Sequence, residues 1–394
     1  MTKNMRYSQF KDLKISKLGF GTMRLPLRAD GSVDEETVFT MVDEALAGGV
    51  NYFDTAWPYH QGMSETVLGR ALAKHDRKTF FVADKYPGHQ IAERYEPDRI
   101  FERQLEKTGL SYFDFYLLHN VYEKSIDVYT DGQWKIMDYF FEQRRKGRIR
   151  HLGFSTHARP DTLRGFIRRY GQEMEFCQIQ MNYLDWTLQD ARAKYEMLTA
   201  AGIPVFVMEP LRGGKLADIR GEDRELMKQM RPNDSCAAWA FRWLEQFDNV
   251  AVILSGMSDR RQLSDNLRTF SSGTPLADSE KVFLFSLAEK MKDSLPCTGC
   301  RYCTDGCPAG LDIPMLIKLL NELHAGPDAT MTPMMQMEAL PEDKRPSACL
   351  SCGLCARICP QKINIPEAMK ELQAVYEKAP KWSDLCRARA SAQK

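Results

Sequence analysis

The sequence has almost no net charge and no long apolar run. Lys and Arg number 54 against 53 Asp and Glu, a formal charge of +1. Long-range attraction to nucleic acid or anionic lipid needs a basic surplus, so we expect neither partner. No eighteen consecutive residues are apolar, and Met1–Phe10 has no apolar core of signal-peptide length. We therefore expect a cytoplasmic protein without a membrane span.

The chain of 394 residues is long for one ordinary domain. From Leu18 onward, strand-like and helix-like segments alternate with a repeat of roughly 30–40 residues, which is typical of βα units and a parallel sheet. Eight such units predict a (β/α)8 TIM barrel, an α/β fold, over residues 1–275, with a smaller helical unit over residues 276–394. The predicted strands are Lys17–Thr22, Val50–Asp54, Phe80–Lys85, Phe113–His119, Arg150–Ser155, Cys177–Asn182, Pro204–Met208 and Val250–Leu254.

Polar side chains end or follow three successive predicted strands. Asp54 ends the second, Tyr59 follows it on the loop, Lys85 ends the third and His119 ends the fourth. Because parallel strands in a barrel present their carboxyl ends at one mouth, we expect the four residues to converge. A lysine ammonium beside a phenol favours phenolate, so we expect the pKa of Tyr59 to fall below its ordinary value of about 10 and the phenol to act as a general acid. Taken singly, each is more often an ordinary solvated or hydrogen-bonded residue.

In order and approximate spacing, these residues resemble the Asp, Tyr, Lys and His tetrad of the aldo-keto reductases, over roughly residues 10–270. The resemblance implies an NAD(P)H-dependent oxidoreductase. In it, Tyr59 would protonate the carbonyl oxygen of a substrate, His119 would orient that carbonyl and Asp54 would hold Lys85. A small carbonyl or alcohol is the implied substrate, and its identity is not encoded in any motif.

The same resemblance implies a coenzyme site at the later strand ends. The nicotinamide would contact Ser155, Thr156, Gln180 and Met208, with Thr156 in place of the usual Asn and Met208 in place of a common aromatic. A Gly-containing loop before a helix is a ready phosphate site, and barrels favour the loops after their last two strands for it. Phosphates and adenine would meet Ser255, Gly256, Met257, Arg261, Asp265 and Asn266. The arginines at 260–261 favour NADPH, with NADH as the alternative.

Eight of the eleven cysteines fall into two short runs with the spacing C-x₂-C-x₂-C-x₃-C-P. Disulfides would be unusual in a reducing compartment, and this spacing is typical of bacterial ferredoxins with 4Fe–4S clusters. In two-cluster ferredoxins the fourth cysteine of each run binds the other cluster. We therefore assign Cys297, Cys300, Cys303 and Cys359 to one cluster, and Cys349, Cys352, Cys355 and Cys307 to the other. Zinc is the alternative, but its sites normally use two ligand pairs with a longer spacer.

The two units leave three functions open. In the first, a carbonyl reductase has clusters that transfer electrons, with a redox partner protein. Because a hydride carries two electrons and a cluster passes one, that function favours a flavin such as FMN in the barrel mouth near Met208. In the second, the clusters only brace the tail. The third is an electron carrier or redox sensor with an inactive barrel, which the intact tetrad disfavours.

Overall fold

The structure, a computed structural model, describes residues 5–392 apart from 91, 292–294, 296, 298–300, 325–330 and 360–361. Its centre is a closed parallel barrel in which the strands follow one another in chain order. All the predicted barrel strands are present, with ends shifted by two residues at most. They are β3 (Leu18–Gly21), β4 (Tyr52–Asp54), β5 (Phe81–Tyr86), β6 (Phe113–Leu118), β7 (Ile149–Thr156), β8 (Cys177–Gln180), β9 (Val205–Met208) and β10 (Val250–Gly256).

Both faces of the barrel strands are buried, which explains why they are apolar throughout. On β6, Phe115 and Leu117 face the barrel interior, whereas Tyr116 and Leu118 belong to the larger core beneath the outer helices. This alternation follows from the two-residue period of a strand.

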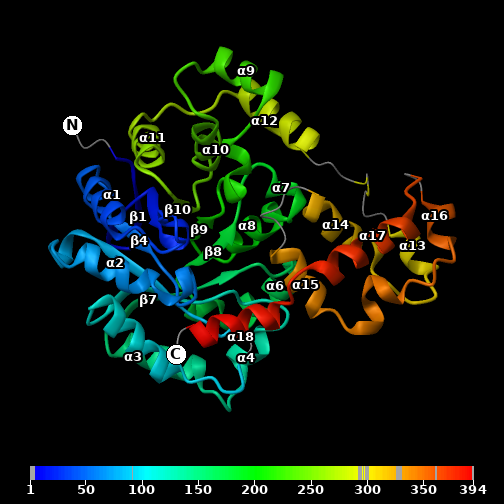
Figure 1. Cartoon of the computed structure of the whole chain (residues 1–394), viewed down its shortest axis with the longest axis horizontal. Helices are drawn as coiled ribbons and strands as arrows, with labels where there is room; N and C mark the ends of the chain where they lie inside the picture. The colour runs from blue at the N-terminus through cyan, green and yellow to red at the C-terminus, as the bar shows by residue number, and fades with distance from the viewer. Residues whose placement is uncertain are drawn as a thin grey trace.

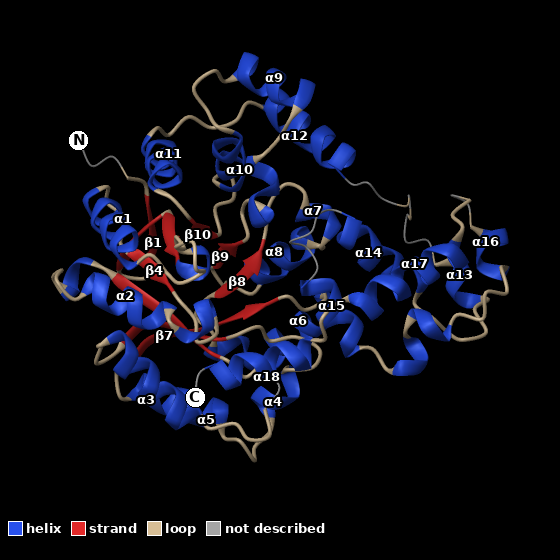
Figure 2. Cartoon of the chain, viewed as in Figure 1, coloured by secondary structure: helices blue, strands red, loops and turns tan. Residues whose placement is uncertain are grey.

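Helices surround the barrel in Figures 1 and 2. The longer ones are α1 (Glu35–Ala47), α2 (Ser64–Leu72), α3 (Pro97–Thr108), α5 (Ile136–Arg145), α6 (Pro160–Tyr170), α8 (Ala191–Ala200), α9 (Gly221–Met230), α10 (Cys236–Leu244) and α11 (Arg260–Ser271). Shorter turns in the loops are η1 (Thr22–Arg24), η2 (Tyr59–Gly62), η3 (Arg77–Thr79), α4 (Ile126–Thr130), η4 (Gly171–Glu173), α7 (Asp185–Leu188) and η5 (Arg212–Ala217).

A short antiparallel hairpin, β1 (Tyr7–Phe10) and β2 (Leu13–Ser16), was not expected from the sequence. Its Phe10 is 2% exposed and packs edge-on against Phe115, Phe176 and Phe206 inside the barrel, with ring centroids 5.4–6.2 Å apart. The hairpin therefore closes the end of the barrel opposite the predicted active-site mouth.

The C-terminal unit is helical and has its own small core. The helix before it, α12 (Asp278–Met291), packs on the barrel core through Leu284, Leu287 and Ala288. The elements that follow are α13 (Tyr302–Asp305), α14 (Ile313–His324), α15 (Met331–Ala339), η7 (Glu342–Lys344), η8 (Pro346–Ala348), α16 (Leu354–Ile358), α17 (Ile365–Lys378) and α18 (Trp382–Ala392). Figure 1 shows α13 and α16 at the end far from the barrel, α14 and α15 beside the barrel, and α18 returning to it. Within the described ranges, no helix combines the length and apolarity that crossing a bilayer requires.

Candidate active site

The four residues expected to converge do lie together at the carboxyl ends of β4, β5 and β6. Lys85 Nζ donates to Asp54 Oδ1 at 2.5 Å and to the Thr55 carbonyl at 2.6 Å. The same ammonium lies 5.1 Å from the centre of the Tyr59 ring, and the rings of Tyr59 and His119 meet edge to face at 6.1 Å. The residues therefore form one contiguous cluster at the mouth.

Lys85 is fully buried, so its charge depends on its partners. Burial alone would lower its pKa, but Asp54 and Tyr59 outweigh that effect and the pKa of Lys85 is raised. Removing one partner of a buried ion pair is costly because the remaining charge stays desolvated. Lys85 is thus held as an ammonium beside the phenol.

The pKa of Tyr59 differs from the sequence expectation. Burial raises the pKa of the phenol, and the Lys85 ammonium opposes this shift without overcoming it, so the pKa lies above its ordinary value. The expected lowering of the Tyr59 pKa is therefore wrong, because desolvation outweighs the attraction of the ammonium. The phenol stays protonated through neutral pH, which is the form that a proton donor needs.

A chain of hydroxyl groups fixes the end of β4. Thr22 Oγ1 donates to the Asp54 carbonyl at 3.0 Å, Ser64 Oγ donates to Thr22 Oγ1 at 2.6 Å, and the hydroxyls of Thr55 and Ser64 are 2.9 Å apart. All these groups are buried, so each bond avoids the cost of an unpaired polar atom. Asp54 is therefore held by the backbone as well as by Lys85.

A second buried network lies behind β5, between the barrel and its helices. Gln104 Nε2 of α3 donates to the Lys85 carbonyl at 3.1 Å and to Glu65 Oε1 of α2 at 3.0 Å. Tyr116 donates to Gln104 Oε1 at 2.5 Å, and Lys107 donates to Glu65 Oε2 at 2.6 Å. The strand that carries Lys85 is thereby tied to the helices outside it.

A cavity of about 310 Å³ opens beside Tyr59 and Asp54. Of the residues expected to bind the coenzyme, it is lined by Met208, Ser255, Gly256, Asp265 and Asn266. Two buried acceptors in its wall, Asp54 Oδ2 and Gln178 Oε1, have no hydrogen-bond partner among the described residues. A cavity of this size with unpaired acceptors beside the phenol fits the reacting end of a nicotinamide coenzyme.

Five other residues expected at the coenzyme do not line this cavity. Ser155 Oγ accepts from the Asn120 amide at 2.8 Å, Thr156 Oγ1 donates to the Val121 carbonyl at 2.6 Å, and Gln180 Nε2 donates to Asp185 Oδ2 at 2.8 Å. The side chain of Met257 is packed in the core, and that of Arg261 is 95% exposed.

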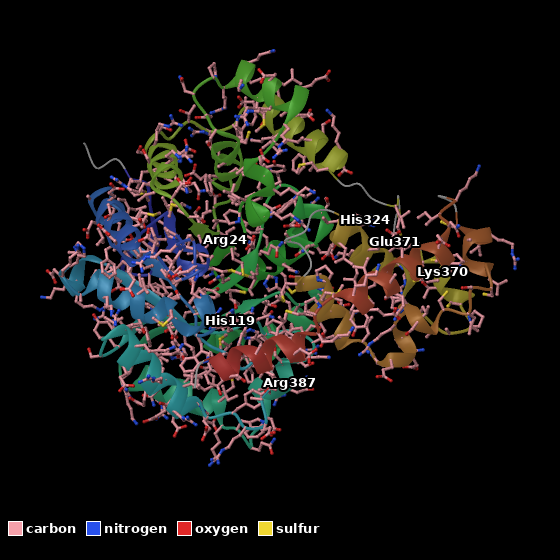
Figure 3. All side chains as sticks on the ribbon, in the orientation of Figure 1. Arg24, His119, His324, Lys370, Glu371 and Arg387 are labelled. Carbon is pink, nitrogen blue, oxygen red and sulfur yellow. The ribbon has the colours of Figure 1, made fainter. Side chains whose placement is uncertain are left out.

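Several cavity residues were missed in the sequence. Arg24 and Glu209 approach each other at 3.7 Å, and Glu209 Oε2 accepts from the Gly213 amide at 2.7 Å (Arg24 is labelled in Figure 3). Gly213 and Gly214 have φ of 67° and 102°, a backbone conformation that favours glycine. The Gly-Gly pair after the seventh barrel strand was a readable signal, whereas nothing local marks Glu209.

The second predicted iron–sulfur site has a clear location. Cys307, Cys349, Cys352 and Cys355, the four residues assigned to it, line one small cavity together with apolar neighbours from α14 and α17. Among the described residues, no three His, Cys, Asp or Glu side chains approach a single-ion site. A cubane spreads its four thiolates over four different irons, so the shared cavity fits a 4Fe–4S cluster.

The first predicted cluster is only partly described. Cys303 is 7% exposed and belongs to the small core, against which Cys297 and Cys359 also pack. Cys300 lies outside the described residues. The cysteines at 177, 236 and 386, which were not assigned to clusters, lie apart in the barrel and in α18.

Comparisons with known proteins match both units. The model of the aldo/keto reductase family matches residues 17–281, and that of a 4Fe-4S dicluster domain matches residues 296–363. The chain is 23% identical over 331 residues to an NADH-specific methylglyoxal reductase of Escherichia coli, covering 71% of this chain and 97% of that protein. It is 25% identical over 290 residues to the uncharacterized oxidoreductase YqkF of Bacillus subtilis, covering 65% and 88%. The holo structure of a Bacillus halodurans aldo-keto reductase superposes with a TM-score of 0.56 at 25% identity, covering 72% and 96%.

Replacing the phenol tests the tetrad directly. Tyr59→Phe keeps the ring and removes the hydroxyl that we expect to donate the proton, so we expect carbonyl reduction to fall about 100-fold or more. Coenzyme binding and iron content should be unchanged. Steady-state kinetics with a small carbonyl compound, beside coenzyme titration and iron analysis, checks this expectation. A variant that keeps most of its kcat would show that another group is the acid.

The exchange of ligands between the two cysteine runs can be tested by comparing single variants. Cys307→Ser should lose the same cluster as Cys355→Ser, about four irons per chain, because both line one cavity. Cys303→Ser should lose the other. Iron analysis with electron paramagnetic resonance of the reduced proteins distinguishes the clusters. If Cys307→Ser instead matched Cys303→Ser, each run would bind its own cluster.

Proposed function

The chain belongs to the aldo/keto reductase family, and we propose that it reduces a small carbonyl compound, or oxidises the matching alcohol, with NADPH. The observation that carries this proposal is the buried Lys85 ammonium, which pairs with Asp54 and lies under the Tyr59 ring at the edge of the cavity. The E. coli relative is a methylglyoxal reductase, so methylglyoxal is a reasoned first substrate to assay.

The proton chemistry follows from the neighbours of Tyr59. When bound, the reduced nicotinamide supplies the hydride to the carbonyl carbon. Tyr59 gives its proton to the carbonyl oxygen, and the Lys85 ammonium stabilises the phenolate that remains. His119, beside the Tyr59 ring, is placed to donate a hydrogen bond to the same oxygen. Lys85 thus stabilises the negative charge that develops on the Tyr59 oxygen during the reaction, rather than the substrate in its ground state.

The preference for NADPH rests on Arg261. The guanidinium of Arg260 is already paired with Glu44. That of Arg261 is 95% exposed, and its ion pair with Asp259 is long, at 3.9 Å. An exposed guanidinium beside the predicted phosphate loop suits a 2′-phosphate, which arginine binds bidentately. NADH stays the alternative, since the E. coli relative is specific for it.

We assign the clusters to electron transfer with a redox partner protein, in a reducing compartment such as the cytoplasm. Cys352 is exposed, and Leu350 and Ile358 beside it are 68% and 55% exposed, an apolar surface near the second cluster site. Protein partners dock on exposed apolar surfaces of this kind.

A ferredoxin-linked reductase with FMN is the second candidate, because Met208 rather than an aromatic lines the cavity. A flavin would accept single electrons from the clusters and pass on two together. Visible spectroscopy of anaerobically purified protein, before and after extraction of any flavin, decides between a bound flavin and its absence.

The coenzyme preference can be measured with one variant and its neighbour as control. Arg261→Ala should raise the KM for NADPH about tenfold, the value of one charge-assisted hydrogen bond, and leave the KM for NADH within about twofold. Arg260→Ala should change neither constant much, because Glu44 already engages that side chain. If the wild type prefers NADH and Arg261→Ala alters neither constant, the coenzyme is NADH.

The role of the clusters can be separated from that of the barrel. If the clusters deliver single electrons to a flavin that passes two on to the substrate, Cys355→Ser should lose substrate reduction driven by dithionite while keeping reduction driven by NADPH. If the clusters only brace the fold, the variant should instead melt at a lower temperature and lose both activities together. Both assays and the melting temperature should therefore be measured on one anaerobic preparation.

A further inference from the structure

The last helix of the cluster domain lies on the barrel mouth. Figures 1 and 2 show α18 crossing this end of the barrel near α4, and α18 packs against η2, the turn that begins with Tyr59. A small apolar cluster, separate from both cores, joins Trp382 and Cys386 of α18 to Met335 of α15 and to Tyr122 and Ala158 in the barrel loops. Trp382 is only 3% exposed.

Trp382 begins a row of three neighbouring rings that ends at His119 of the tetrad. Its indole stacks on the imidazole of His89 with centroids 5.6 Å apart and planes 26° apart, and its Nε1 donates to the His89 carbonyl at 3.3 Å. His89 lies in turn 4.2 Å from His119. Figure 3 labels His119 at the barrel and Arg387 on α18.

We infer that Trp382 is a positioning residue for His119, acting through His89, so that the cluster domain completes the carbonyl-binding wall of the barrel. This inference rests on the proposed function. It assigns to the C-terminal domain a role in substrate binding that does not depend on electron transfer. It also explains why an aromatic side chain at the start of α18 is buried against a polar ring of the other domain.

The row of rings also limits the contact of the imidazoles with water, since His89 is 6% exposed and His119 is partly buried. The titratable and charged groups around His89 are Arg389 of α18, His157 and His119, and Trp382 covers its ring. Those around His119 are His89, Lys85, His157 and Arg389. Burial, followed by Arg389, lowers the pKa of His89 to about 3, and burial, followed by His89 and Lys85, lowers the pKa of His119 well below its ordinary value. Both rings are therefore neutral at physiological pH.

Neutral rings matter here because a protonated pair at 4.2 Å would repel. Repulsion would move His119 away from the carbonyl oxygen. The Nδ1 atoms of both histidines are buried and have no hydrogen-bond partner among the described residues. Stacking and exclusion of water, rather than a hydrogen bond at Nδ1, thus hold these rings in place.

Docking of the domain does not depend on Trp382 alone. Lys318 of α14 pairs with Asp190, Gln189 donates to Glu322 at 3.2 Å, and Gln336 of α15 donates to the His157 carbonyl at 3.3 Å. Lys318→Met is therefore a matched control, because it weakens the same domain contact without touching the row of rings.

The test compares Trp382→Leu, Trp382→Phe and Lys318→Met with the wild type as holoprotein. Histidine side chains are titrated by nuclear magnetic resonance, with His89→Phe and His119→Phe to assign the signals. Carbonyl KM, coenzyme affinity and the pH profile of kcat/KM are measured on the same preparations. The titration does not require turnover, so it remains decisive if no carbonyl is reduced and the proposed function fails.

In the wild type, neither ring should titrate above about pH 5. Trp382→Leu should admit water and raise the pKa of His119 by about one unit or more. It should also raise the carbonyl KM about tenfold and introduce an inflection in the pH profile of kcat/KM between about pH 5 and 7. Coenzyme affinity should stay within twofold. Trp382→Phe should restore most of the wild-type behaviour, and Lys318→Met should lower only the melting temperature.

Two results would overturn the inference. One is a Trp382→Leu protein whose histidine titrations and carbonyl KM match those of Lys318→Met, since the tryptophan would then serve docking alone. The other is a wild-type titration of His89 and His119 near their ordinary value of about 6.5. This second result decides the question even if Trp382→Leu fails to fold.

Discussion

The buried ion pair between Lys85 and Asp54 is the interaction on which the catalytic cluster depends. An ammonium with no exposed surface needs a carboxylate partner and further acceptors, and here Asp54 Oδ1 and the Thr55 carbonyl provide them. The hydroxyl chain through Thr22 and Ser64 holds the strand end that carries both acceptors. These polar contacts together therefore hold the Lys85 ammonium beside the Tyr59 phenol.

The same mouth receives the C-terminal domain, and this placement relates the two units. Helices α13 and α16, which hold Cys303 and Cys355, lie at the far end of that domain, while α14, α15 and α18 face the barrel (Figure 1). Glu322 of α14 is buried at this contact, close enough for the charges of Lys318, Arg212 and Lys194 to oppose the rise that burial causes in its pKa. Arg212 pairs with Asp185 and begins η5, the turn whose glycines line the coenzyme cavity. The described cluster cysteines of α13 and α16 are thus remote from the tetrad, whereas α14, α15 and α18 of the same domain contact the barrel.

The sequence predicted what depends on local pattern. The apolar runs predicted all the barrel strands. The convergence of parallel strands at one mouth predicted that Asp54, Tyr59, Lys85 and His119 lie together. The cysteine spacing predicted that Cys307 lies with the cysteines of the second run. It failed where burial or distant contacts decide. The pKa of Tyr59 rises because the effect of desolvation exceeds that of the Lys85 charge. No local pattern in the sequence predicts that Trp382 stacks on His89. Ser155, Thr156 and Gln180 are adjacent to the mouth, but hydrogen bonds to neighbouring loops engage their side chains.

The central claim, that Tyr59 protonates the carbonyl while Lys85 stabilises the resulting phenolate, is tested most directly by a single turnover of the bound coenzyme. Anaerobic protein loaded with NADPH or NADH would be mixed with a small carbonyl substrate in light and heavy water, and the loss of coenzyme absorbance followed. We expect a solvent isotope effect in the wild type. In Lys85→Met the step should slow by about 100-fold or more, because the phenolate loses its stabilising charge. Coenzyme oxidation at the wild-type rate in Lys85→Met, with the isotope effect intact, would contradict the account.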